Sequence, residues 1–431
     1  MLSSKSTIMA TLALLALFLG VAILNSLLVL VSIPLFAYLV LSIVYSSESK
    51  SDLVFNRTIE KSTIYEDEEV IVKLDVENAG SKLDFLEITD VVPSKLSIVE
   101  GTNHLIISLD RGEKFSFTYS VRPKVYGYYG IDRVLTKYGD VQGTISGERI
   151  YDVDTYLRVL PKIAYISKIN IRPRRTKNWP GEILAKKPGS GMEFYSLRDY
   201  LGGDPVRRIN WKASSRADEL YTNQFLSELG GDTIIALDAR TVSEVGRPPE
   251  STITYSTRAA GVIAYRLLRD RNRVGLIALG SRLEKVSPGF GKRQFDRILV
   301  SLSMTSPGDV WDISALGRFL STFFSTMVQI VLISSLNDRK AFDSIIDVAS
   351  RGFRVLVISP SPIEIEKRAA LQKKQYDESY NIGERVLRIQ RQNKLNNLRK
   401  FAVVADWNVE QPLTEALAEA TNQWNRQKIS I

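Results

Sequence analysis

The side chains most able to do chemistry follow a short apolar segment near the middle of the chain. Residues 233–237 read as a buried strand that Asp238 closes, and Arg240, Thr241 and Ser243 come soon after it. In an open α/β sheet, ligands bind outside the carboxyl ends of the strands. Because carboxylates and hydroxyls are the ligands of hard divalent cations, these four residues form a candidate site at the edge of a sheet.

Two residue types argue against a metal ion at this point. A von Willebrand factor A domain has Asp-x-Ser-x-Ser after the strand, whereas this chain places Arg240 and Val242 where the serines would be. A later strand ends near Ser335, with Asp338 beyond it. A guanidinium beside the site opposes a dication. We therefore expect a degenerate site around Asp238 and Ser335 that holds no metal ion, and we expect no cofactor.

Composition excludes several classes of enzyme. The 431 residues contain no cysteine and one histidine, His104. No thiolate nucleophile, disulfide or histidine-based triad can therefore be built within the chain. His104 lies in a strand-rich region, where a structural role is expected. Residues 289–293, Gly-Phe-Gly-Lys-Arg, lack the glycine spacing and the Ser or Thr of a phosphate-binding loop. We expect a protein that is not an enzyme.

A second segment, residues 191–221, is dense in aromatic rings, arginines and carboxylates. Its candidate residues are Glu193, Tyr195, Arg198, Asp199, Tyr200, Asp204, Arg207, Arg208, Asn210, Trp211 and Lys212. The carboxylates would repel a phosphate, but arginine forks can hold them while lying on aromatic rings. We interpret the segment as a joint that docks onto the α/β domain and leaves a surface for a partner. A purely structural joint is the alternative.

The same region is strongly basic. Residues 171–216 contain eleven lysines and arginines against four acidic residues, a net charge of +7 in a chain of +9. Such a stripe suits nucleic acid, anionic lipid or an acidic protein face. A nucleic-acid- or anionic-lipid-binding membrane protein that uses this segment is therefore the alternative function, with nucleic acid the weaker partner because of the interleaved carboxylates. A merely solvated charge run also stays open.

The amino-terminal segment predicts a membrane hairpin. No charged residue occurs from 6 to 45, and a polar pair near the centre divides the stretch into spans of about 6–24 and 27–45. Each is long enough for a hydrocarbon core of about 30 Å. Lys5 and Arg57 fall on one side, which by the positive-inside bias places the soluble domains in the cytoplasm. We expect a two-span protein of the cell membrane, with the bilayer and other membrane proteins among its partners. A signal peptide is the alternative.

The remaining periodicities predict the domain organisation. Apolar residues alternate at 70–77 and again at 115–121, which indicates antiparallel strands of an immunoglobulin-like sandwich. From 232 onward, short apolar strands alternate with helices, which is typical of a mostly parallel sheet covered on both faces. The expected domains are a transmembrane hairpin (1–50), a β-sandwich (51–161), a basic linker and joint (162–230) and a von Willebrand factor A-like α/β domain (231–431).

The dense segment resembles the signature of a family catalogued as domain of unknown function number fifty-eight. The resemblance rests on residues 191–195, 198–200, 203–204, 207–211 and 212–214, with Glu228 further on. It implies the architecture given above and association with MoxR-type AAA+ ATPases. We therefore expect a membrane-anchored, non-enzymatic scaffold or adaptor. It would present its von Willebrand factor A-like domain to cytoplasmic partners, chiefly such an ATPase, during the assembly or maturation of protein complexes.

Overall fold

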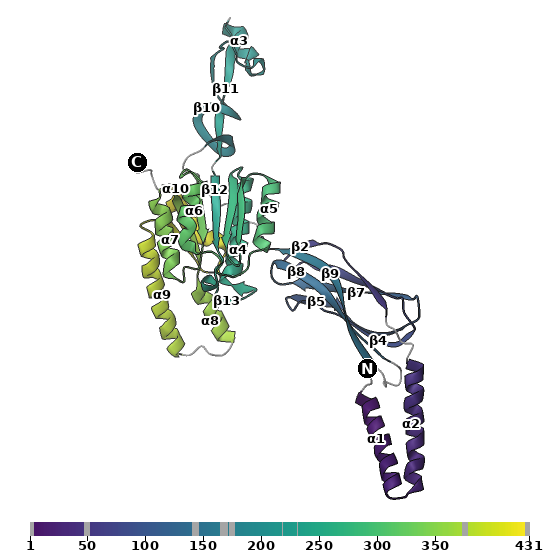
Figure 1. Ribbon diagram of the computed structural model, residues 1–431. Coiled ribbons are helices and arrows are strands. Elements are labelled where there is room, and N and C mark those ends of the chain that lie inside the picture. The colour runs from purple at the N-terminus through teal and green to yellow at the C-terminus, as the bar shows by residue number, and fades with distance from the viewer. Residues whose placement is uncertain are drawn as a thin grey trace. The chain divides into compact units, whose positions relative to one another are not determined.

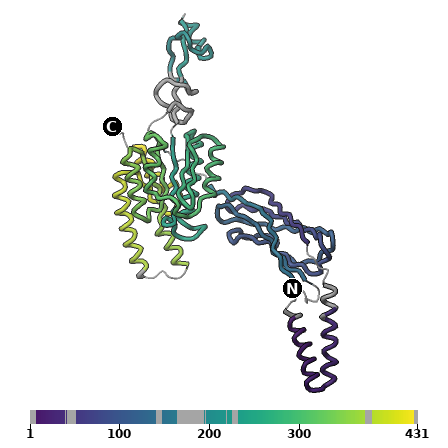
Figure 2. Tube along the Cα trace, in the orientation of Figure 1, coloured from purple at the N-terminus to yellow at the C-terminus, as the bar shows by residue number. Residues whose placement is uncertain are grey.

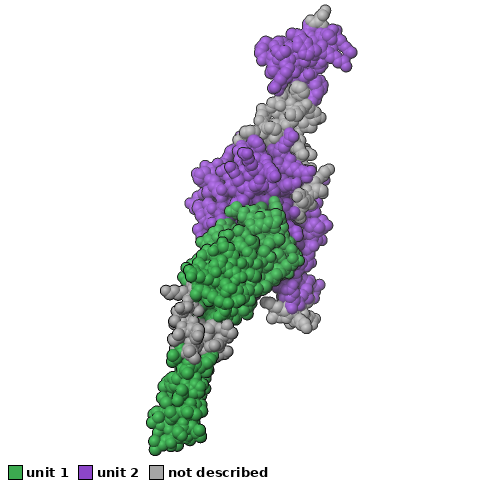
Figure 3. All heavy atoms as spheres, turned by 90° about the vertical axis from the view of Figure 1, so that its right-hand side faces the viewer, with its two compact units in different colours: residues 1–160 green, residues 161–431 purple. Residues whose placement is uncertain are grey.

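The chain folds into two compact units, residues 1–160 and residues 161–431 (Figure 3). Figures 1 and 2 follow the chain between its two ends. The computed structural model describes residues 4–46, 52–139, 146–163, 171, 177–217, 219–230, 232–372 and 378–426.

Two helices, α1 (Ser4–Ala22) and α2 (Ser26–Ser46), form where the charge-free segment lies. The expectation that they cross a membrane is wrong: among the residues that the structure describes, no helix combines the length and the apolarity that a bilayer span requires. A span needs about 20 predominantly apolar residues, and α1 has 19 residues that begin with Ser-Lys-Ser-Thr. The same finding corrects the predicted localisation in a cell membrane with two spans.

The strands of the first unit form two sheets with the orders β1-β3-β7-β5 and β2-β9-β8-β4-β6. They are β1 (Leu53–Ile59), β2 (Thr63–Tyr65), β3 (Val70–Asn78), β4 (Leu83–Asp90), β5 (Leu96–Gly101), β6 (His104–Leu109), β7 (Lys114–Pro123), β8 (Gly127–Gly139) and β9 (Ser146–Leu160). Neighbouring strands are antiparallel except β2 and β9, which pair in parallel. The second sheet is therefore mixed.

The two sheets share an apolar core. Successive side chains of a strand point to opposite faces, and β3 alternates buried and less buried residues along its length. One cluster joins Val72 and Val121 of the first sheet to Ile131 and Leu157 of the second, and all four are fully buried. The alternation at 70–77 thus places one face of β3 against the opposite sheet.

A buried ion pair ties the strands of this unit together. The side chains of Arg57 in β1 and Asp90 in β4 are both fully buried. Arg57 Nε donates to Asp90 Oδ2 at 3.0 Å, and Arg57 Nη1 donates to the carbonyls of Ile131 and Val153. Tyr119 Oη donates to the same carboxylate at 2.7 Å. Arg57, which the sequence placed beside a membrane, is instead a structural group inside the sandwich.

The second unit contains a long β-hairpin, β10 with β11, and a six-stranded sheet with helices. Its elements are β10 (Lys177–Asp199), η1 (Val206–Arg208), α3 (Trp211–Ala217), β11 (Tyr221–Gly230), β12 (Asp232–Asp238), η2 (Thr241–Ser243), β13 (Gly246–Arg247), β14 (Glu250–Ser251), α4 (Thr252–Arg269), β15 (Arg273–Leu279), β16 (Leu283–Gly289), α5 (Lys292–Ser303), η3 (Ile313–Ala315), α6 (Leu316–Phe323), β17 (Gln329–Ile333), α7 (Arg339–Ser350), β18 (Arg354–Pro360), α8 (Pro362–Gln372), α9 (Glu378–Leu398), β19 (Val403–Trp407) and α10 (Leu413–Arg426).

The six-stranded sheet is mixed. Its order is β16-β15-β12-β17-β18-β19, and β16 runs antiparallel to β15 while the other neighbours are parallel. The connection from Leu279 to Leu283 is too short for a crossover, so β16 has to return as a hairpin strand. The predicted fold class, a transmembrane hairpin followed by a mostly parallel von Willebrand factor A-like domain, is corrected accordingly: the chain is a β-rich and α/β fold with mixed sheets.

Helices cover both faces of this sheet (Figure 1). On one face Leu320 of α6, Ile345 of α7 and Leu395 of α9 pack with Ile330 and Val357 of the central strands. Helices α4 and α5 lie against the strands from the other side. Because neither face meets water, the central strands are apolar without alternation.

We predict that Arg57→Met destabilises the first unit by about 3–5 kcal/mol, because Asp90 would keep a buried charge without its partner. Urea unfolding monitored by far-UV circular dichroism measures the change in the free energy of unfolding. Arg122→Met is the matched control, since Arg122 pairs with Glu69 on the surface and exposed pairs contribute little. Equal stability of the two variants would contradict a structural role for the buried pair.

Candidate functional site

The topology of the six-stranded sheet decides where the candidate site lies. From β12 the chain goes to β15 on one side, and it later returns to β17 on the other side of β12. The loops after β12 and β17 therefore leave the carboxyl edge in opposite directions, at the switch point where open α/β sheets bind ligands. Asp238 ends β12, and residues 334–338 follow β17. The predicted sheet-edge residues thus lie at this switch point.

Arg240 lies between two carboxylates. Its Nε and Nη2 donate to Oδ1 and Oδ2 of Asp238 at 2.8 and 3.0 Å. Its Nη1 and Nη2 donate to Oδ2 and Oδ1 of Asp338, both at 2.9 Å. The side chain of Arg240 is 5% exposed and that of Asp238 is fully buried. The planar guanidinium therefore holds both carboxylates in bidentate pairs that water barely reaches.

Two hydroxyl groups complete the surroundings of Asp238. Ser243 Oγ and Ser334 Oγ each donate to Asp238 Oδ2 at 2.7 Å. Sequence reasoning named Ser335 here, but Ser335 Oγ donates to the carbonyl of Ser243 at 2.9 Å instead. Successive residues of an extended segment point to opposite sides, so only Ser334 reaches the carboxylate. The serine that matters is one residue earlier than expected.

Thr241 is the predicted sheet-edge residue that the structure does not bring to Asp238. It is exposed, and its backbone N–H donates to Asp309 Oδ1 at 3.1 Å. Thr241 begins the short helix η2, whose last residue, Ser243, supplies the hydroxyl. The tight turn of η2 therefore brings the hydroxyl of Ser243, and not that of Thr241, to Asp238.

The opposite charges of Arg240 and Asp338 shift each other's pKa. Partial burial of Asp338 opposes ionisation, but the hydrogen bonds and charge of Arg240 outweigh it and hold the pKa of that carboxyl below its ordinary value. Burial likewise disfavours the charged form of Arg240, yet the two carboxylates raise the pKa of its guanidinium. Asp338 also caps α7, since its Oδ1 accepts from the N–H of Ala341 at 3.2 Å. Arg240 and Asp338 therefore hold each other in their charged forms at neutral pH.

The arrangement is a satisfied ion-pair network. The guanidinium occupies the position between the carboxylates that a dication would need, and both oxygens of Asp238 already accept hydrogen bonds. Among the residues that the structure describes, no group of three or more His, Cys, Asp or Glu side chains could hold a metal ion. The residues present do not fit a cation, and what they do is fix the loops after β12 and β17 to each other.

Arg391 is a site residue that sequence reasoning missed. Its Nη2 donates to Asp406 Oδ1 and to Ser359 Oγ, both at 2.8 Å, and its Nη1 donates to the carbonyl of Ser335 at 3.0 Å. Arg391 thereby ties α9 to the ends of β17, β18 and β19. In the sequence it stands among other basic residues of the same helix, so no local signal separated it from them.

The arginine-rich segment forms the end of the β10–β11 hairpin. Arg198 Nη2 donates to Asp204 Oδ1 at 2.7 Å, and the N–H of Leu201 donates to Asp204 Oδ2 at 3.1 Å. These two hydrogen bonds, the arginine's first, lower the pKa of the Asp204 carboxyl. Tyr200 Oη donates to the carbonyl of Asp204 at 3.3 Å. Of the ion pairs expected in this segment, the structure shows the one between Arg198 and Asp204, which lies within the tip of the hairpin.

Asn210 connects α3 to the second strand of the hairpin. Its Oδ1 accepts from the N–H of Ala213 at 3.0 Å, at the start of α3. Its Nδ2 donates to Asn223 Oδ1 at 2.9 Å, and its backbone N–H donates to the carbonyl of Tyr221 at 2.8 Å. The tip is thus a small structured platform built on one strand pair.

Apolar and basic residues face solvent on this platform. Trp211, Val206 and Leu201 are each 63% exposed, and Arg207 and Lys212 beside them are exposed as well. We call these five residues the tip surface. A large exposed ring beside cations is a combination that marks binding sites rather than folding cores.

The other signature residues are less informative. Asp199 is exposed, and Arg208 is half-buried. The side chains of Glu193, Tyr195 and Glu228 lie outside the described residues, as does most of the basic segment between 172 and 193.

We predict that Arg240→Met lowers the stability of the α/β domain by about 3–5 kcal/mol, because it leaves Asp238 buried and unpaired with Asp338 nearby. Thermal or urea unfolding of the full chain provides the measurement. Arg339→Met is the control, since Arg339 pairs with Asp343 on an exposed helix face. An Arg240→Met protein as stable as this control would contradict the network's structural role.

We also predict that Mg²⁺ and Mn²⁺ give no saturable heat when titrated into the full chain, since a dication would have to displace Arg240. Isothermal titration calorimetry is the measurement. A stoichiometric micromolar site that disappears in Asp238→Asn would contradict this prediction and would show that the guanidinium moves aside.

Parts of the chain are similar to known proteins and families. An uncharacterized protein of Mycobacterium bovis and one of Mycobacterium tuberculosis are each 27% identical over 128 residues, which cover 30% of this chain and 40% of the relative. The chain thus spans less than half the length of these curated relatives. Residues 33–151 also match the model of the family described as translocon-associated protein beta (TRAPB).

Solved structures add little. A protein of unknown function from Porphyromonas gingivalis is 12% identical with a TM-score of 0.21, covering 40% of this chain and 80% of its own. The CARDB domain of a Pyrococcus furiosus protein, solved with di-metal ions, is 16% identical with a TM-score of 0.19, covering 26% of this chain and 96% of its own. Scores this low carry no argument.

The family match fits the region that carries the signature. A family model covers residues 196–366, from the end of β10 through the switch point to α8. This stretch contains the tip surface and the Asp238–Arg240–Asp338 network. Residues 196–366 therefore match the family described as protein of unknown function DUF58.

Proposed function

We propose that this protein is a non-enzymatic adaptor whose tip surface binds a AAA+ ATPase of the MoxR type during the assembly or maturation of protein complexes. The kind of partner comes from the family resemblance of the signature. The observation that carries the proposal is the exposure of Trp211 on a platform that hydrogen bonds hold in shape.

The tip surface has the composition of a contact site. Tryptophan and arginine are the residues that most often dominate binding free energy at protein interfaces. Trp211 and Arg207 are exposed beside Val206, and the Arg198–Asp204 pair fixes the turn that precedes them. A preformed platform loses less conformational entropy on binding than a flexible loop would.

The α/β domain supports an adaptor role in a different way. Its switch point, where related topologies bind ligands, is filled by the chain's own Arg240 between Asp238 and Asp338. This self-satisfied edge favours a rigid scaffold over a reaction centre. The proposed division of labour is that the hairpin makes the contact and the α/β domain supplies a stable body.

We predict that Arg207→Ala combined with Trp211→Ala weakens ATPase association by about 2 kcal/mol or more, a loss of about thirtyfold. Biolayer interferometry measures the affinity of the purified ATPase for the wild-type full-length adaptor and for each variant. Lys400→Ala with Phe401→Ala is the matched control, because it also removes an exposed basic residue and an exposed ring.

The same experiment separates contact from support. Both double variants must unfold at the wild-type urea concentration before binding is compared. Wild-type affinity in the folded Arg207/Trp211 variant would remove the contact role from the tip surface. An adaptor that retains no MoxR-type ATPase after crosslinking would remove the proposed partner altogether.

A further inference from the structure

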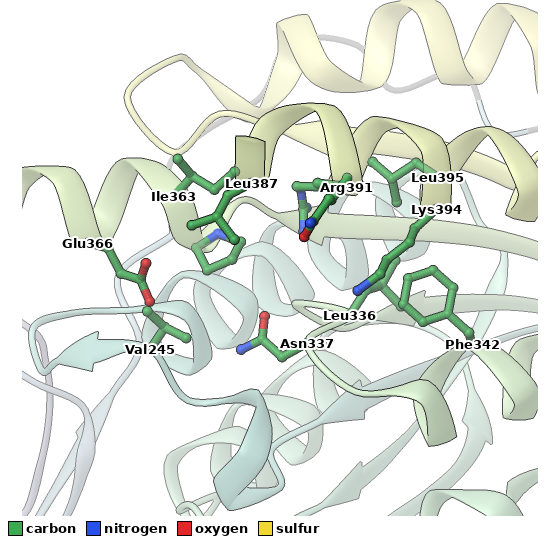
Figure 4. A pocket seen from close by; sticks show the side chains of 12 residues that line it. Val245, Leu336, Asn337, Phe342, Ile363, Glu366, Leu387, Arg391, Lys394 and Leu395 are labelled. Atoms are coloured by element: carbon green, nitrogen blue, oxygen red, sulfur yellow. The ribbon is translucent and has the colours of Figure 1, made fainter. Parts of the chain in front are cut away.

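A surface pocket lies at the carboxyl edge of the α/β sheet, beside the Asp238–Arg240–Asp338 network (Figure 4). Its volume is about 210 Å³. The segments that follow β12, β17 and β18 contribute Val245, Leu336 and Ile363 to its lining, and α9 contributes Leu387, Lys394 and Leu395; we call the apolar part of this lining the floor. The pocket therefore occupies the part of the fold where open α/β sheets bind ligands.

The floor of the pocket is apolar. Leu336, Ile363 and Leu395 are buried and line it together with Phe342 of α7. Leu387 of α9 is 48% exposed at its rim. The pocket can accept one or two aliphatic side chains, and a ligand that covers Leu387 would remove its apolar surface from water.

Opposite charges stand at the two ends of this floor. Lys394 lies over Leu336 and Phe342, and Glu366 lies at the other end beside Val245 (Figure 4). Lys394 is exposed and has no carboxylate partner among the described residues. Solvent reaches Glu366 as well, but the surrounding protein desolvates its carboxylate and raises its pKa. Both side chains are therefore accessible to a ligand that lies along the floor, and an opposite charge on that ligand would favour the ionised form of Glu366.

Two further polar groups of the pocket are already committed. Arg391 is held by Asp406 and Ser359, and Asn337 Nδ2 donates to the carbonyl of Val242 at 3.2 Å. They set the shape of the walls, which leaves Lys394 and Glu366 to select the charge of the ligand.

The wall that contains Leu336 is conformationally strained. Leu336 has a φ of 57°, a left-handed conformation that non-glycine residues seldom adopt and that clusters at ligand sites. Its neighbours hold it in place, because Ser334 Oγ accepts from its N–H at 3.2 Å and Arg391 binds the carbonyl of Ser335. The strained residue is thus fixed between the ion-pair network and the pocket.

We propose that this pocket binds an extended segment of a partner protein in which aliphatic residues lie between an acidic and a basic residue. The aliphatic side chains rest on Leu336 and Leu395, the acidic side chain pairs with Lys394, and the basic side chain pairs with Glu366. This site is separate from the tip surface, so the inference does not depend on the proposed ATPase contact.

The pocket is also coupled to the switch-point network. Leu336 and Asn337 line the pocket, and the same loop supplies Ser334 and Asp338 to the Arg240 cluster. A segment bound against Leu336 would hold that loop in its present conformation. We therefore expect saturating ligand to raise the thermal midpoint of the full chain by ordinary mass action.

Fluorescence anisotropy with two labelled octapeptides tests the proposal on the full-length protein. One peptide carries Glu-Leu-Leu-Lys between Gly-Ser flanks, and the other carries Lys-Leu-Leu-Glu, so that both chain directions are sampled. We expect one of them to bind. Lys394→Glu should weaken it about tenfold, and Leu387→Ala should weaken it severalfold.

Matched controls and a charge exchange decide between outcomes. Lys400→Glu and Ile389→Ala alter the same helical region without lining the pocket and should bind the peptide as wild type does. A peptide with Lys in place of its Glu should regain affinity for Lys394→Glu. The proposal would be overturned if neither peptide bound with a Kd below about 1 mM, the range of weak interactions. Equal losses of affinity in the control variants would overturn it as well.

Discussion

The guanidinium of Arg240 is the group on which the organisation of the α/β domain depends. A parallel sheet with a switch point leaves a gap in its carboxyl edge, since the loops on either side diverge. Here the chain closes that gap itself. One side chain from the loop after β12 pairs with Asp238 of its own strand and with Asp338 at the start of α7, and burial strengthens both pairs.

This closure has a cost that the surrounding structure offsets. Buried charges are stable only when their remaining hydrogen-bonding capacity is met, and Ser243 and Ser334 provide that for Asp238. The first unit uses the same solution, with Arg57 and Asp90 joined by Tyr119 and by two strand carbonyls. In both units a single arginine connects segments that are distant in sequence, so each acts as a fixed body.

Two sites on the second unit remain exposed to partners, the tip surface and the pocket. The tip surface presents Trp211 and Arg207 without burying them, and the pocket beside the switch point presents Lys394 and Glu366 over an apolar floor. The Ser334–Asp338 loop belongs to both the closed network and the pocket. The closed network therefore determines the conformation that a ligand in the pocket would meet.

The sequence by itself determined the elements whose cause is local. The alternation at 70–77 became β3 and the apolar run before Asp238 became β12, because the spacing of apolar residues along the chain predicts such strands directly. The sequence predicted a membrane hairpin that the described helices do not support. It also did not predict that β16 runs antiparallel to β15, which the short connection between them requires. Only the tertiary structure decided that Ser334 rather than Ser335 reaches Asp238, that Asp338 shares Arg240, and that Arg391 is structural. Those contacts join residues up to 98 positions apart, and their partners are chosen by strand order, which no local pattern contains.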